Sequence, residues 1–207
     1  MPLFLQNIQV YLRYFLKPLL KLGDFAVDAT AGRGRDTLFL AECVGSEGRV
    51  YAFDIQAEAL SVTERLLKEH ALEDRVVLAQ VDHARMAEIV PRRVKLIMFN
   101  LGYLPGGDPS LITQPQSTLA ALQAGLTLLQ VNGVIAITVY RGHPGGEAEA
   151  RAVEEFLAGV PASIFSVLKG EYINQVADAP YWIMIQRKRE DLGHEDSPAE
   201  KNPGIDC

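Results

Sequence analysis

The sequence is poor in cysteine and histidine, the residue types that build disulfide frameworks and many metal sites. Its 207 residues include two cysteines, Cys43 and Cys207, and four histidines. So few cysteines argue against a disulfide framework and fit a reducing cytoplasm. No pair of histidines has metal-ligand spacing with support from an acid or a thiol. The sequence therefore predicts a cytoplasmic protein without a metal site.

Long apolar runs are also absent. The opening stretch Met1–Leu5 is apolar, but five polar residues soon interrupt the pattern, and no small-residue cleavage site follows. These polar residues are Gln6, Asn7, Gln9, Arg13 and Lys17. We therefore predict an amphipathic N-terminal helix, and neither a signal peptide nor a membrane span.

The excess of negative charge is small and lies mostly at one end. The formal net charge is −6, and the residues from Glu190 onward contain six acids and one base, so the preceding body is close to neutral. We predict a single domain over residues 1–189, which includes the N-terminal helix, and an acidic disordered tail over residues 190–207. A near-neutral body can still present a basic patch to RNA. The candidate arginines are Arg33, Arg35, Arg85, Arg92, Arg93 and Arg141.

Short apolar runs alternate with helical patterns along the body. The predicted strands are approximately Phe25–Ala29, Arg49–Asp54, Val76–Gln80, Lys95–Asn100, Val134–Tyr140, Ser163–Leu168 and Tyr181–Gln186. The predicted helices are Asp36–Cys43, Ala57–His70, Gln116–Gln130, which Asn132-Gly133 would cap, and Gly146–Ala158. This alternation predicts a Rossmann-like α/β fold with a seven-stranded, mostly parallel sheet and helices on both faces. The segment between the last two strands is too short for a crossover helix, so they should pair antiparallel.

A turn with two glycines follows the first predicted strand. Glycine lets the backbone approach a ligand closely, and the helix that follows presents N–H groups to a negative group. The turn lacks the third glycine of the dinucleotide fingerprint. Its pattern D-x-x-x-G-x-G instead resembles the first motif of class I S-adenosylmethionine-dependent methyltransferases; a tight turn with no ligand is the alternative. The candidate cofactor-binding residues here are Asp28, Thr30, Gly32, Gly34, Asp36 and Thr37.

Polar residues also follow the second and third predicted strands, at the edge of the sheet where ligands of α/β folds bind. Asp54 can accept hydrogen bonds from both hydroxyls of a ribose, with Gln56 beside it. Asp82 can accept a hydrogen bond from the exocyclic amine of adenine, with His83 next to it. For both carboxylates, capping of the following helix is the alternative or additional role.

Asn100-Leu101-Gly102-Tyr103 follows the fourth predicted strand and is the main indication of catalysis. It has the spacing of the Asn-Pro-Pro-Tyr loop of amino-group methyltransferases, and Asn100 is also a candidate cofactor contact. An amide oxygen can accept a hydrogen bond from an amine and aim its lone pair, while a tyrosine ring can stack on a base. His143, after the fifth strand, is a candidate proton acceptor or RNA contact. For the loop from Asn100 to Tyr103, the alternative is a structural turn with a buried tyrosine.

Four stretches together are similar to a bacterial "putative rRNA methylase" family. They are Asp28–Ala41, Tyr51–Gln56, Met98–Asp108 and Tyr140–Gly146, within a resemblance that runs from about Lys21 to Lys188. Three positions depart from the family pattern: Arg33 and Arg35 stand where Asn and His are common, and Asp82 stands where Ser is common.

The resemblance implies an S-adenosylmethionine-dependent enzyme that methylates the amine of 5-aminomethyl-(2-thio)uridine at the wobble position of tRNA. The partner would be the tRNA anticodon loop, with no membrane association and with a homodimer possible. Methylation of rRNA or of a small molecule is one alternative. A non-catalytic module that binds cofactor and RNA is another, although the intact loop from Asn100 to Tyr103 argues against it.

Overall fold

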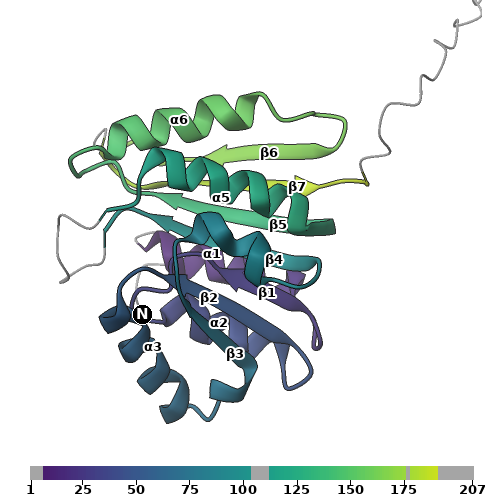
Figure 1. The fold of residues 1–207 in the computed structure, drawn as a ribbon. Coiled ribbons are helices and arrows are strands. Elements are labelled where there is room, and N and C mark those ends of the chain that lie inside the picture. The colour runs from purple at the N-terminus through teal and green to yellow at the C-terminus, as the bar shows by residue number, and fades with distance from the viewer. Residues whose placement is uncertain (1–6, 104–111, 176–177, 191–207) are drawn as a thin grey trace, which may run out of the picture.

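A computed structural model describes residues 7–103, 112–175 and 178–190. Seven strands form one sheet in the order β3-β2-β1-β4-β5-β7-β6 (Figure 1). The strands are β1 Phe25–Asp28, β2 Arg49–Asp54, β3 Val76–Gln80, β4 Val94–Leu101, β5 Leu129–Val139, β6 Phe165–Gly170 and β7 Tyr181–Arg187. Strands β3, β2, β1, β4 and β5 pair in parallel, whereas β7 is antiparallel to both β5 and β6. The predicted fold class is confirmed.

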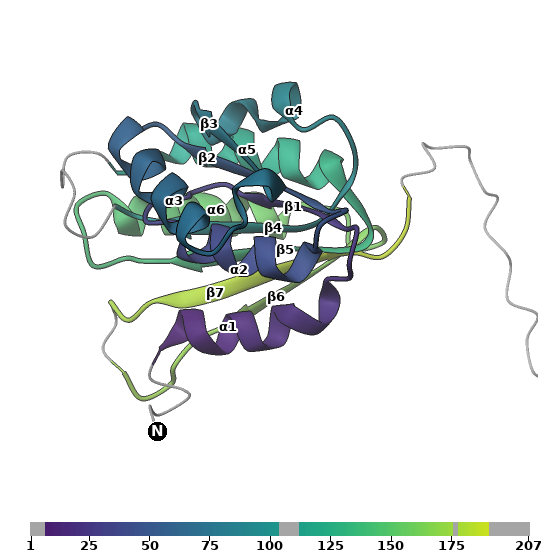
Figure 2. The ribbon, with the colours of Figure 1, turned by 90° about the horizontal axis from the view of Figure 1, so that it is seen from below.

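Helices cover both faces of the sheet (Figure 2). The longer ones are α1 Ile8–Leu16, α2 Arg35–Val44, α3 Ala57–Glu69, α5 Pro115–Leu128 and α6 Gly146–Ala158. Short elements, which the sequence did not predict, are α4 Met86–Ile89 and the 3₁₀ turns η2 Lys17–Leu19, η3 Glu73–Arg75 and η4 His83–Arg85. Helices α1 and α2 pack in one hydrophobic cluster on one face, and α4, α5 and α6 contribute to a second cluster on the other.

Strand β4 shows why the central strands are apolar on both faces. Ile97 and Phe99 pack in the cluster under α5 and α6, whereas the alternate residues Leu96 and Met98 pack in the cluster under α1 and α2. All four side chains are almost fully buried. A strand that is buried on both faces reads as a continuous apolar run, which is the pattern that identifies it in the sequence.

The predicted helix cap at Asn132-Gly133 is wrong. Helix α5 ends at Leu128 and β5 begins directly at Leu129, so Asn132 lies inside the strand, with a left-handed φ of 61°. The pairing with β4 jumps from Leu129 to Val134, which leaves extra residues as an irregularity in β5. Asparagine tolerates the left-handed conformation, so the signal that suggested a helix terminus marks a bulge instead.

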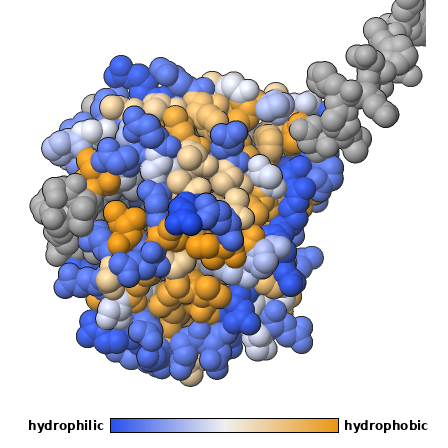
Figure 3. Space-filling model, in the orientation of Figure 1, coloured by the Kyte–Doolittle hydropathy of each residue, from blue (hydrophilic) through white to orange (hydrophobic). Residues whose placement is uncertain are grey.

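The surface mixes hydrophilic and hydrophobic residues (Figure 3). Within the described residues, no helix is both long enough and apolar enough to span a membrane. The predicted acidic tail, apart from Glu190, and the loop from Leu104 to Asp108 lie outside the described residues.

Candidate active site

A cavity of about 530 Å³ opens at the carboxyl ends of β1, β2 and β4. Most of the predicted site residues line it: Thr30, Gly32, Asp36, Asp54, Gln56, Asp82, His83, Asn100 and Tyr103. Four do not: Asp28, Gly34, Thr37 and His143. The residues that the sequence placed at separate strand ends are therefore largely brought together in one cavity.

The two glycines of the turn between β1 and α2 have different surroundings. Gly32 lines the cavity, whereas Gly34 faces α3, where an added Cβ would lie 2.9 Å from the Thr63 side chain. Both have positive φ, 53° and 77°, which favours glycine. Thr63 Oγ1 also donates to the Gly32 carbonyl at 3.1 Å. The turn therefore packs against α3 at Gly34, where a side chain would not fit.

Asp28 and Thr37 support this turn from beneath. Asp28 is fully buried, and its carboxylate accepts hydrogen bonds from Thr37 Oγ1 at 2.6 Å and from the Thr30 amide at 3.2 Å. Burial, together with the nearby Asp36 carboxylate, raises the pKa of Asp28 to about 7. The structure therefore places Asp28 and Thr37 behind the cavity wall, where they fix the shape of the turn.

Asp54, at the tip of β2, uses both carboxylate oxygens within the protein. Oδ2 accepts from the Gly32 amide and Oδ1 from the Gln56 amide, each at 2.9 Å. These bonds hold the carboxylate rigidly against the glycine turn. Each carboxylate oxygen has a second lone pair, so Asp54 can still accept one hydrogen bond at each oxygen from a ligand diol.

Asp82 and His83 form the wall beyond β3. Burial alone would raise the pKa of Asp82, but hydrogen bonds from Ser117 and from the Ala84 amide outweigh it, and the pKa is lowered. Asp82 therefore caps η4, the alternative role considered from the sequence. His83 Nδ1 lies 3.0 Å from the Ala29 carbonyl, which can only accept, so Nδ1 carries the proton. The His83 Nε2 is buried and has no hydrogen-bond partner within residues 7–103, 112–175 and 178–190.

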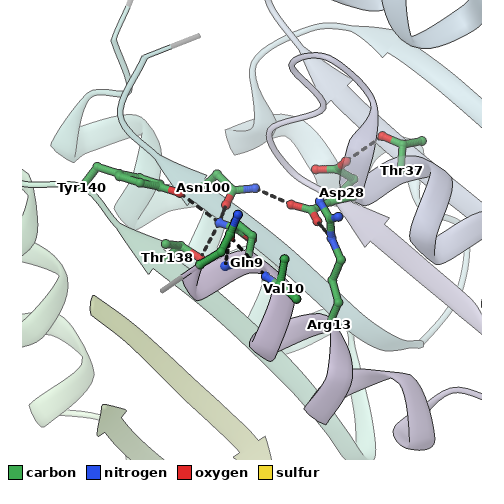
Figure 4. A network of polar contacts seen from close by, with 10 residues as sticks. Gln9, Val10, Arg13, Asp28, Thr37, Asn100, Thr138 and Tyr140 are labelled. Carbon is green, nitrogen blue, oxygen red and sulfur yellow. Dashed lines mark hydrogen bonds and ion pairs between the residues drawn. The ribbon is translucent and has the colours of Figure 1, made fainter. Parts of the chain in front are cut away.

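Asn100, at the end of β4, has its amide orientation fixed (Figure 4). Its Nδ2 donates to Asp36 Oδ2 at 2.7 Å, and Arg13 Nε donates to the other oxygen of Asp36 at 2.6 Å. The Asn100 backbone amide donates to Thr30 Oγ1 at 2.8 Å. Because the Asp36 carboxylate can only accept, the amide oxygen of Asn100 must point the other way.

The sequence reasoning missed that α1 enters the site. Gln9 Nε2 lies within hydrogen-bond reach of Asn100 Oδ1, of Thr138 Oγ1 at 2.9 Å and of Tyr140 OH at 3.2 Å (Figure 4). Gln9 and Arg13 both line the cavity and stand one helical turn apart. Their spacing as polar residues in an otherwise apolar stretch was the available signal, and we interpreted it only as the polar side of an amphipathic helix.

The loop after β4 is anchored to a buried acid. Thr113 Oγ1 accepts from the Gly102 amide at 2.9 Å and donates to Glu149 Oε2 at 2.6 Å. Glu149 is 2% exposed and also accepts from Thr118 Oγ1 at 2.6 Å. Helices α5 and α6 therefore hold Gly102, and with it the start of the loop, in place beside the cavity.

Tyr103 lines the cavity, and His143, which does not line it, packs against the Tyr103 ring. Their rings meet edge to face with centroids 5.8 Å apart, and the Tyr103 side chain is 48% exposed. His143 Nδ1 lies 3.1 Å from the Pro144 carbonyl, which can only accept, so Nδ1 carries a hydrogen. The Nε2 of His143 is buried and has no hydrogen-bond partner among the residues that the structure describes. The exposed Tyr103 ring can stack on a base.

The titratable residues of the site do not form a metal centre. Across residues 7–103, 112–175 and 178–190, no group of three or more His, Cys, Asp or Glu side chains could hold a metal ion. The donors and acceptors described above suit an organic ligand with hydroxyl, amine and heterocyclic groups.

The sheet order, with β7 inserted antiparallel between β5 and β6, and the cavity at the ends of β1, β2 and β4 define a class I S-adenosylmethionine-dependent methyltransferase fold. The family model described as "Putative rRNA methylase" matches residues 50–186, and the chain belongs to this family.

Three relatives extend the comparison. The chain is 41% identical to the tRNA (mnm(5)s(2)U34)-methyltransferase of Arabidopsis thaliana chloroplasts over 180 residues, which are 82% of this chain and 66% of that protein. A crystal structure of a "putative rRNA-methylase" from Clostridium thermocellum is 40% identical, with a TM-score of 0.86 over 89% of this chain and 100% of that one. A "putative methyltransferase" from Streptococcus mutans, solved in complex with SAH, is 33% identical, with a TM-score of 0.80 over 88% and 98%.

Proposed function

We propose that this chain is an S-adenosylmethionine-dependent N-methyltransferase that methylates the aminomethyl group of 5-aminomethyl-(2-thio)uridine at the wobble position of tRNA. The observation that carries the proposal is the fixed amide of Asn100: because Nδ2 donates to Asp36, the acceptor oxygen Oδ1 is held in one direction. A fixed acceptor is what an amine needs for its lone pair to be aimed. The Arabidopsis relative, which is named for this modification, supports the substrate class.

The cavity fits the proposed cofactor in its donor and acceptor groups. Asp54 offers one free lone pair on each oxygen to the two ribose hydroxyls, and the unpartnered Nε2 of His83 offers an acceptor to the adenine amine. Gly32 keeps the turn clear of a side chain beside them. When bound, the cofactor supplies an electrophilic methyl group on a sulfonium.

Methyl transfer to an amine requires a neutral nitrogen with its lone pair directed at the methyl carbon. As the C–N bond forms, the C–S bond breaks and its electron pair stays on sulfur, and the nitrogen must lose one proton. In our proposal Asn100 Oδ1 holds an N–H of the amine, and Tyr103 stacks on the base. The proposed proton acceptor is the Nε2 of His143, which has no hydrogen-bond partner in the described part of the chain and lies in the ring that contacts Tyr103.

Methylation of rRNA is the second candidate, because the description of the family names rRNA. The chain covers only 66% of the Arabidopsis protein, so that relative alone does not decide the RNA species. A comparison of substrates separates the two candidates.

The test is methylation in vitro with labelled S-adenosylmethionine, followed by mass spectrometry of the nucleosides. Three substrates are compared: tRNA that carries 5-aminomethyluridine, the same tRNA without the aminomethyl group, and ribosomal RNA. We expect one methyl group per modified wobble uridine and no product on the other two RNAs. Methylation of ribosomal RNA alone, or of unmodified tRNA at another nucleoside, would refute the proposed acceptor.

A further inference from the structure

The six arginines of the predicted basic patch differ in whether they already interact with other residues of the protein. Arg85 forms an ion pair with Glu88 at 2.6 Å, and Arg93 donates to two carbonyls of the α5–β5 junction. Arg92 lies over the Phe25 ring at 4.5 Å, and Arg141 lies over the Tyr181 ring at 4.9 Å. These four arginines are engaged within the fold.

Arg33 and Arg35 are different. Both are exposed, and neither makes a hydrogen bond or an ion pair with the described residues. Together with Arg65 of α3, which is also exposed and unpaired there, they line a second hollow of about 330 Å³. The other lining residues are Val62, Leu66 and Glu69. Three guanidinium groups therefore face one carboxylate.

The second hollow adjoins the candidate active site. Arg33 and Arg35 line both the main cavity and the second hollow, whereas Arg65 lines only the second. A ligand that enters the main cavity over the α2 terminus therefore has these guanidinium groups beside its path. Because the body of the chain is close to neutral, an unpaired cluster of three cations is a local exception in its charge distribution.

We propose that Arg33, Arg35 and Arg65 form a binding site for the phosphodiester backbone of the RNA whose base enters the main cavity. Arginine matches phosphate oxygens with a planar fork of N–H donors, and it does not lose its charge at any physiological pH. Contacts of this kind position an RNA without reading its sequence. The inference rests on the proposed function, since it takes RNA as the substrate.

The test measures how the salt dependence of RNA binding changes in Arg65→Gln and in Arg33→Gln/Arg65→Gln. The probe is an unmodified anticodon stem-loop, and its affinity is followed by fluorescence anisotropy between low and moderate salt. Each lost phosphate contact should lower the slope of log affinity against log salt by about 1. We expect a several-fold weaker affinity at low salt for Arg65→Gln and a larger loss for the double variant.

Lys68→Gln is the matched control, because Lys68 is on the same helix and carries the same charge but is already paired with Glu64 at 2.6 Å. Its slope should stay close to that of the wild type. Calorimetric titration with S-adenosylhomocysteine accompanies each variant that includes Arg33, because Arg33 also lines the cofactor cavity. Unchanged cofactor affinity shows that the effect is on RNA.

The outcomes separate this inference from the proposed function. Equal slopes for Arg65→Gln, Lys68→Gln and wild type would overturn the phosphate site, even if wild-type protein methylates tRNA. Arginine-dependent RNA binding without methylation of the aminomethyl group would support the site and refute the proposed reaction. Wild-type protein that does not bind the stem-loop at any salt concentration would overturn the phosphate site, whereas the proposed function is decided separately by methylation of the modified tRNA.

Discussion

Replacement of Gln9 by alanine is the sharpest test of whether α1 belongs to the active site. The Gln9 amide nitrogen lies within hydrogen-bond reach of acceptors on Asn100, Thr138 and Tyr140, which are 91 to 131 residues away in sequence. Alanine keeps the helix, since it has the best helix propensity, and removes only the amide. Val10→Ala is the matched control, because Val10 is the next residue and its side chain is 46% exposed.

The size of the expected effect follows from the hydrogen bonds that are lost. An intramolecular hydrogen bond contributes a net of about 0.5–1.5 kcal/mol, and a buried polar group left without a partner costs about 1–3 kcal/mol. Thr138 is 2% exposed, so water replaces Gln9 poorly there. We expect Gln9→Ala to lower the free energy of unfolding by about 1–3 kcal/mol.

The catalytic effect should appear in kcat more than in cofactor binding. Without Gln9, Asn100 Oδ1 loses the donor that fixes its position, while Asp36 still holds Nδ2. A loss of about 1.4–2.7 kcal/mol in orientation of the amine corresponds to a 10- to 100-fold lower turnover. Affinity for S-adenosylhomocysteine should change little, because Asp54 and Gly32 are untouched.

Gln9→Glu gives a second readout that a purely structural role would not produce. The introduced carboxylate can accept from the hydroxyls of Thr138 and Tyr140, but it cannot donate to Asn100 Oδ1. Asn100 then has carboxylates on both sides of its amide, at Asp36 and at position 9. We therefore expect the ionised form of Gln9→Glu to have lower turnover than Gln9→Ala, although glutamate is closer to glutamine in size than alanine is.

The assay is single-turnover methylation of tRNA that carries 5-aminomethyluridine, with calorimetry for S-adenosylhomocysteine and chemical denaturation for stability. If Gln9→Ala loses stability as expected but keeps the turnover of the wild type, Gln9 contributes to packing and not to catalysis. Equal turnover of Gln9→Ala and Gln9→Glu would refute the argument from amide polarity. A loss of turnover in Val10→Ala equal to that in Gln9→Ala would attribute the effect to α1 as a whole.

Three further predictions concern the cavity wall. Asp54→Ala should weaken S-adenosylhomocysteine binding by about 1.5–3 kcal/mol in calorimetry, because the ribose hydroxyls lose a charged acceptor; unchanged affinity in a folded variant would remove Asp54 from the site. Asn100→Ala should cut single-turnover methylation on the order of 100-fold with cofactor affinity nearly unchanged; wild-type rates would make the loop a structural turn. Because the pKa of Asp28 is about 7 in the fold and about 3.9 in the unfolded chain, the native state binds the extra proton between these values and stability falls as pH rises through them. Asp28→Asn, which keeps an acceptor for Thr37, should flatten this decline in denaturation measured from pH 4 to 8, and an unchanged pH dependence would contradict the raised pKa.

The central strands β1, β2 and β4 were predictable from the sequence because nearly all of their residues are buried, whereas the edge strand β3, with one buried residue, was marked by its run of β-branched and apolar residues. The predicted ranges of β2 and β3 agree with the structure at both ends, and β1 differs by one residue. The edge strand β6 was predicted two residues too early, as Ser163–Leu168 instead of Phe165–Gly170. Four of its six residues are exposed, so burial does not mark its ends as it does in the central strands.

The candidate site was predictable where polar residues follow strands directly. Asp54 and Asn100 could be placed at one edge because parallel strands deliver their carboxyl ends there. Which of the residues in a turn face the ligand was not predictable: Asp28 and Gly34 belong to the same motif as Gly32 but point away from the cavity. That distinction depends on the contact of Gly34 with Thr63 of α3 and on the hydrogen bond of Asp28 with Thr37 of α2, which the motif alone does not encode.

The contribution of α1 could not be predicted because it depends on polarity matched across three elements. Asp36 of α2 can only accept, so Asn100 of β4 must present its oxygen on the other side, and only a donor can satisfy that oxygen. Gln9 of α1 supplies the donor, and Arg13, one turn later, neutralises Asp36. None of these residues marks a site within its own segment. Glutamine and glutamate at position 9 would fit the helix pattern equally well, and the need for a donor appears only after α1 has packed on the sheet. An amide whose direction depends on both neighbours responds to a change in either one, so Gln9 and Arg13 should act on turnover through the same side chain, Asn100.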